Sequence, residues 1–87
     1  MNPKTVSELN HDMCQAACLG HLEKVKVCKI WGATDFNKAM ASAARCGYLE
    51  IVKACRKWGG TDFDWAMSNA AEGGYLEIVK ALKFDQS

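Results

Sequence analysis

The sequence lacks any long apolar run. No stretch approaches the roughly 18 consecutive apolar residues that mark a membrane-spanning helix, so we expect no membrane span. It also lacks an excess of one charge, because 11 Lys and Arg residues against 10 Asp and Glu residues leave a net charge of +1. This balance gives no overall field that would favour nucleic acid or an anionic membrane. Residues 1–13 contain no apolar segment, so we predict no secretory signal.

Catalytic signatures are also missing. The chain has no Gly-rich phosphate loop, no Ser, His and Asp in the order of a known triad, and no pair of carboxylates expected to be buried together. A catalytic cysteine would need a neighbouring base and a lowered thiol pKa, and no histidine recurs near Cys28 or Cys55. We therefore predict that the protein is not an enzyme and uses no cofactor.

The chain contains five cysteines, an odd number in a sequence without a predicted secretory signal. We interpret them as reduced thiols of an intracellular protein, located in the cytoplasm, in a host cell or in a virion. Cys28 and Cys55 are predicted to act as small buried apolar residues. Cys14 and Cys46 are expected to be partly exposed.

An internal repeat of 27 residues runs through the chain. The stretches WGATDFNKAM (31–40) and WGGTDFDWAM (58–67) match at seven of ten positions. Other residues recur three times at the same interval: Gly20, Gly47 and Gly74; Leu22, Leu49 and Leu76; Val25, Val52 and Val79; Met13, Met40 and Met67. Such a period predicts a single repeat domain over 1–87, with units at about 8–34, 35–61 and 62–87.

Each unit is predicted to form two short helices. In the second unit, Phe36, Met40 and Ala43 lie at helical spacing and form an apolar stripe. Thr34 or Asp35 can cap the start of this helix, and Gly47 can end it in a left-handed conformation. No segment shows the alternation of a strand. The predicted fold is all-α, a helical-hairpin solenoid with helices near 8–19, 21–31, 36–46, 48–58, 63–73 and 75–84.

The segment AARCGYLEIVKACRKWGG resembles the ankyrin repeat, as do AACLGHLEKVKVCKIWGA and AAEGGYLEIVKALK. The pairs 20–21, 47–48 and 74–75 match the Gly-His corner of the family, and the pairs 51–52 and 78–79 match its Ile-Val; the first unit departs with Lys24-Val25. The resemblance covers roughly residues 11–84. The family's Thr-Pro-Leu-His start and its β-hairpin finger are missing. The units resemble a short ankyrin variant found in some large DNA viruses.

This resemblance implies that the first helix of each unit lines a concave, protein-binding face. Trp65 is the leading candidate contact, because its equivalents are His11 and Lys38 and the repeat does not demand an aromatic there. The full candidate set is Trp65, Arg45, Lys38, Ser42, Asn69 and Glu72. The implied function is a non-enzymatic protein–protein interaction module, such as a viral protein acting on host factors.

An alternative function arises from the ends of the repeat array. Terminal repeats normally need a polar outer face, yet the last predicted helix carries Leu76, Val79, Leu82 and Phe84. An apolar outer flank would be covered by self-association or by docking into a larger assembly, such as a virion. The alternative is therefore a structural subunit that docks through the ends of its solenoid.

Two further sites are disfavoured. Four residues with zinc-type spacing, His11, Cys14, Cys18 and His21, would fall on one stripe of a helix, which cannot enclose a metal tetrahedrally. Basic residues also form rows, at 26, 53 and 80 and at 29, 56 and 83. Glutamates at 23, 50 and 77 accompany them, which favours a solvated face over a nucleic-acid site.

Overall fold

The computed structural model describes residues 4–84 and confirms an all-α fold. Within this range there is no β-strand. The helices are α1 (Val6–Leu19), α2 (Leu22–Ile30), α3 (Phe36–Cys46), α4 (Leu49–Lys57), α5 (Phe63–Gly73) and α6 (Leu76–Phe84). The predicted boundaries agree to within two residues, and the largest difference is the earlier start of α1. None of these helices is both long and apolar enough to cross a bilayer.

Side-chain caps fix where the first helix of each pair begins. Asp35 accepts a hydrogen bond from the Lys38 amide at 3.1 Å, so Asp35 rather than Thr34 caps α3. Asp62 caps α5 in the same way. The first helix uses a different device, because Thr5 and Glu8 form a reciprocal capping box that adds a turn to its start.

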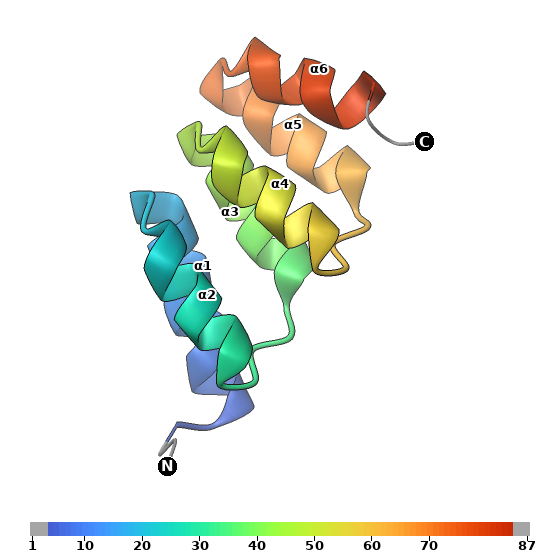
Figure 1. Cartoon of the computed structure of the whole chain (residues 1–87). Coiled ribbons are helices and arrows are strands. Elements are labelled where there is room, and N and C mark those ends of the chain that lie inside the picture. The colour runs from blue at the N-terminus through green and yellow to red at the C-terminus, as the bar shows by residue number, and fades with distance from the viewer. Residues whose placement is uncertain (1–3, 85–87) are drawn as a thin grey trace.

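The helices form three antiparallel pairs that follow one another in a row, as Figure 1 shows. Helices α1, α3 and α5 pack extensively against one another and make one layer. Helices α2, α4 and α6 make the second layer and touch one another only slightly. The row measures 40 × 24 × 18 Å. One layer is therefore tightly packed, whereas the other is open between its helices.

The core lies between the two layers and continues from pair to pair. Its members are apolar and mostly small, which lets the first helices approach closely. Met13, Met40, Ile51 and Cys55 are all buried, and Cys28 is buried as predicted. No polar or charged residue in the described part of the chain is buried. Helix association thus depends on apolar packing, with polar contacts confined to the edges of the joints.

An asparagine connects each pair to the next. The Asn10 side-chain oxygen accepts hydrogen bonds from the backbone amides of Thr34 and Asp35, at 2.7 and 3.0 Å. One period later, Asn37 accepts from the amides of Thr61 and Asp62 at the same two distances. These bonds satisfy amides just before the next helix, which a loop would otherwise leave to water. We call this contact the asparagine clamp.

A glycine and a tyrosine make the second recurring contact between pairs. Gly20 and Gly47 end α1 and α3 with positive φ angles of 81° and 87°. A methyl group on Gly20 would lie 2.6 Å from the ring of Tyr48, and one on Gly47 would lie 2.4 Å from the ring of Tyr75. Each glycine therefore ends a helix and also makes room for the aromatic ring of the following pair.

Candidate protein-binding surface

The predicted candidates lie on one solvent-facing stripe of each first helix. On α3 and α5 the stripe follows helical spacing, so its members share one face. All of them are exposed or half-buried although the three helices pack together. We define the first-helix surface by nine residues: His11, Gln15 and Cys18 on α1, Lys38, Ser42 and Arg45 on α3, and Trp65, Asn69 and Glu72 on α5.

Trp65 combines a fixed backbone with an exposed ring. Its amide donates to the Asp62 cap at 3.1 Å, and its carbonyl accepts from the Asn69 side-chain amide at 2.9 Å. The side chain nevertheless leaves 43% of the residue exposed. Tryptophan is enriched among the residues that anchor protein interfaces. Asn69 thus supports Trp65 in addition to lining the surface.

Lys38 lies beside a shallow polar groove between α1 and α3. The groove is lined by Val6, Ser7, Asn10, His11, Asp35 and Lys38. The start of α1 contributes Val6 and Ser7 to its lining, and Asn10 and Asp35 of the asparagine clamp also line it. Ser7 and Asn10 are not among the predicted site residues: Ser7 precedes the predicted helix start at residue 8, whereas Asn10 lies inside that helix and only its contact with the next pair reveals its role. The capping-box pair Thr5 and Glu8 was the sequence signal for this wall.

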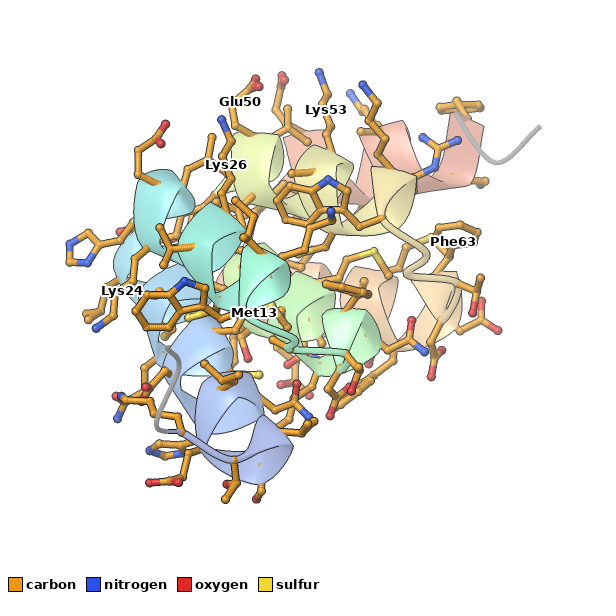
Figure 2. The ribbon with its side chains drawn as sticks, turned by 60° about the horizontal axis from the view of Figure 1, so that its bottom comes forward. Met13, Lys24, Lys26, Glu50, Lys53 and Phe63 are labelled. Atoms are coloured by element: carbon orange, nitrogen blue, oxygen red, sulfur yellow. The ribbon has the colours of Figure 1, made fainter. Side chains whose placement is uncertain are left out.

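A second groove lies in the open layer, between α2 and α4. Figure 2 shows Lys26, Glu50 and Lys53 along its rim, and Trp58 and Leu22 contribute its apolar part. Lys26 pairs with Glu23 at 3.5 Å, within the same helix. Alternating charge of this kind suits a solvated rim better than an anion site.

The other basic row is turned onto aromatic rings. The Lys29 ammonium lies 5.3 Å from the centroid of Trp58, and the Arg56 guanidinium lies 5.6 Å from that of Phe63. At these distances a cation is attracted to the ring face. Both residues therefore bridge consecutive pairs, since each cation and its ring come from neighbouring repeat units.

The zinc-type residues do not converge. Cys14 is buried, whereas Cys18, one helical turn further along α1, is exposed on the first-helix surface, so the two thiols lie in different environments. Among residues 4–84, no three His, Cys, Asp or Glu side chains are placed to hold a metal ion. The burial of Cys14 corrects the expectation of partial exposure. Cys14 is buried because α1 packs against α3. The equivalent residue of α3, Ala41, is also buried.

Burial makes most of the thiols poor nucleophiles. It raises the pKa of Cys14 to about 11 and that of Cys55 to about 12. The pKa of Cys46 is also raised to about 11, by burial and by a hydrogen bond with Cys18. A thiol with such a pKa stays protonated near neutral pH and is a weak nucleophile. The structure also brings Cys18 and Cys46 together across the first joint, which sequence spacing did not indicate.

The fold and surface define a small all-α protein built from stacked helical hairpins. No family model matches the chain, and no curated protein or solved structure is similar enough to count as a match.

Proposed function

We propose that this chain is a short ankyrin-like repeat protein that binds a protein partner through its first-helix surface. One observation carries the proposal: three equivalent positions on each of α1, α3 and α5 stay exposed or half-buried while the helices beneath them pack tightly. Side chains that vary from repeat to repeat are thereby displayed on a common backbone. Repeat proteins use such continuous surfaces for recognition.

The shape of the row supports the same surface. Because the first helices lie closer together than the second helices, the row is expected to curve toward the first-helix surface. A concave surface with one exposed indole and both signs of charge suits a folded protein or peptide partner. The proposal assigns the chain no chemical step, in keeping with the raised pKa of Cys14, Cys46 and Cys55. The five free thiols support an intracellular site of action.

The test is affinity capture from cell extract with matched variants. The first variant combines Trp65→Ala and Arg45→Ala. The control combines Lys53→Ala and Lys80→Ala, which alter exposed residues of the second-helix layer. We expect a protein retained by the natural chain to be retained by the control and lost with the first variant, because truncating an interface anchor costs about 2 kcal/mol or more. Equal retention of every captured protein by both variants would refute the proposal.

A second candidate function is favoured by one feature of the last helix pair. Leu76 and Phe84 leave 66% and 72% of their surface exposed. This supports a structural subunit that docks through the end of its row. Sedimentation of the natural chain and of the Leu76→Ser variant tests this candidate. A natural chain that stays monomeric excludes self-association through this end.

A further inference from the structure

The two ends of the row expose different residues. Comparison with the two internal joints shows which residues at each end could pack against another helix pair. At each joint, one pair presents a receiving side and the next pair an inserting side. The receiving side consists of residues that are buried in the first two pairs but whose equivalents in the third pair are more exposed. Ala17 and Ala44 are fully buried, but the equivalent Ala71 is exposed. Met67 and Val79 are likewise more exposed than their counterparts.

The C-terminal end keeps the other receiving elements as well. Gly74 ends α5 with a φ of 82°, as Gly20 and Gly47 end their helices, but among residues 4–84 no atom beyond its chain neighbours lies within 4 Å of a methyl group placed on it. No residue in the described part of the chain therefore fills the space that Tyr48 and Tyr75 occupy at the two joints. Asp64 occupies the position of Asn10 and Asn37. Its carboxylate oxygens can accept two backbone amides as the asparagines do, with the added strength of a charge.

The N-terminal end does not offer a matching inserting side. Ala39 and Ala66 are fully buried, but Asp12 occupies the equivalent position in α1 and pairs with Lys4. Ile51 and Ile78 are also buried, and their equivalent is Lys24. Figure 2 shows Lys24 on the side of α2 away from α4. Docking this end onto Gly74 of another copy would bury the charges of Asp12 and Lys24. The desolvation free energy of these charges would exceed the stabilisation gained from the contact.

We propose that the C-terminal end, formed by Asp64, Met67, Ala71, Gly74 and Val79, is a docking site for one helical hairpin of a partner protein. The hairpin that fits has Ala and Ile at the positions of Ala39 and Ile51, an aromatic ring for Gly74, and two backbone amides for Asp64. These are the features that the two internal joints bury. A second copy of the chain lacks them, so Asp12 and Lys24 prevent head-to-tail growth of the row into a filament.

The test uses a probe whose N-terminal end copies an internal joint. The probe is the full chain with Asp12→Ala, His21→Tyr and Lys24→Ile, with the sequence of residues 31–35 replacing residues 4–8, and with Ala71→Glu to block its own C-terminal end. Its helical circular dichroism confirms that it folds. We expect the natural chain and the probe to be monomers alone and to form a 1:1 complex in sedimentation equilibrium.

Two variants of the natural chain locate the contact. Ala71→Glu is expected to weaken probe binding by more than about tenfold, because a charge enters a position whose counterparts are fully buried. Val27→Glu adds the same charge on an exposed position of α2, outside the first-helix surface, and is expected to leave binding unchanged. Failure of a folded probe to bind overturns the proposal. So does a natural chain that dimerises alone and is made monomeric by Ala71→Glu, because a second copy would then be the occupant.

A fourth hairpin attached to the same chain tests the docking site independently of the probe. Appending a copy of residues 61–84 after residue 87 preserves the period and supplies a fourth hairpin to the C-terminal end. We expect the thermal unfolding midpoint to rise, and Gly74→Ala to become as destabilising as Gly47→Ala. An unchanged midpoint, or a rise that Ala71→Glu leaves intact, means that this end does not receive a hairpin.

Discussion

The ring of Tyr75 lies directly against the Cα of Gly47, close enough to leave no room for a methyl group. Gly74 has nearly the same backbone conformation, with a φ of 82° against 87°, but no described residue places a ring against it. The two glycines therefore separate two reasons for having glycine at a helix end. One is the left-handed backbone, and the other is the close approach of the next pair.

We expect Gly74→Ala to lower the free energy of unfolding by about 1 kcal/mol, the cost of placing a side chain in the left-handed region. Gly47→Ala has the same backbone cost and must also displace the Tyr75 ring, which adds about 1 kcal/mol or more. Urea denaturation of both variants measures the difference. Equal losses would mean that Tyr75 moves aside freely and that the tyrosine contact adds little to the joint.

The asparagine clamp gives a second comparison between equivalent positions. Asn37→Ala removes the acceptor of two backbone amides and is expected to cost about 1 kcal/mol, because the exposed amides regain water. Asn37→Asp keeps the acceptor and is expected to restore most of that loss.

The matched control is Asp64→Ala at the end of the row, where the described residues provide no amides to accept. It loses only a favourable charge near the start of α5, worth about 0.5 kcal/mol. Chemical denaturation again provides the measurement. A loss for Asp64→Ala as large as that for Asn37→Ala would show that the clamp stabilises its own helix rather than the joint.

Thiol labelling should distinguish the cysteines by burial. Cys18 is exposed and is expected to react first with iodoacetamide at neutral pH. Cys46 should follow slowly, because its pKa of about 11 leaves little thiolate. Its rate should rise about tenfold for each pH unit below that pKa. The buried Cys14 and Cys55 should react only after unfolding.

Peptide mapping by mass spectrometry assigns the labelled sites, and Cys18→Ser serves as the control that removes the fast phase. Rapid labelling of Cys14 or Cys55 in the folded protein would contradict the close packing of α1 against α3.

The start of α1 should respond to both acid and alkali. The hydrogen bond from Lys4 lowers the pKa of Asp12 below its ordinary 3.8, and the bonds from Thr5 lower that of Glu8 below 4.5. Their contribution to stability is present above these ordinary values and is lost as pH falls through the lowered ones. The pKa of Lys4 is raised above 10.5 by Asp12, so its contribution is lost as pH rises through the raised value.

The additional turn of α1 should therefore be most stable between about pH 4.5 and 10.5. Amide NMR shifts of residues 6–9 over a pH titration report on this turn. Asp12→Asn removes the carboxylate and should move the alkaline transition of Lys4 toward 10.5, while an unchanged transition would show that the pair does not persist in solution.

Much of the fold could be predicted from the sequence because the repeat shows three equivalent residues at each position of the unit. Helix ends at Gly20, Gly47 and Gly74 and burial at Cys28 and Cys55 follow from equivalence alone. The capping box of Thr5 and Glu8 occurs once and lies outside the period, so the start of α1 was placed two residues late. A repeat pattern predicts what its units share and misses what one unit adds.

The contacts between pairs were harder to predict, because they depend on the register of one helix against another. Nothing in the spacing of Cys18 and Cys46 indicates that they meet. Asn10 and Asn37 recur at the period, but their bonds to amides 24 and 25 residues away need the three-dimensional stacking. The six predicted candidate residues do lie on one surface, and whether that surface binds a partner stays a prediction.

The tight layer of α1, α3 and α5 also has a consequence for how the chain unfolds. Of the three pairs formed by residues 4–84, only the α3–α4 pair has a neighbour on both sides, so its hydrogen bonds should open last and its amides should exchange most slowly with solvent. The α5–α6 pair, with Ala71 and Gly74 uncovered, should exchange fastest of the three. Fraying would then begin at the end where a partner is proposed to dock, and binding there would slow exchange along the whole row.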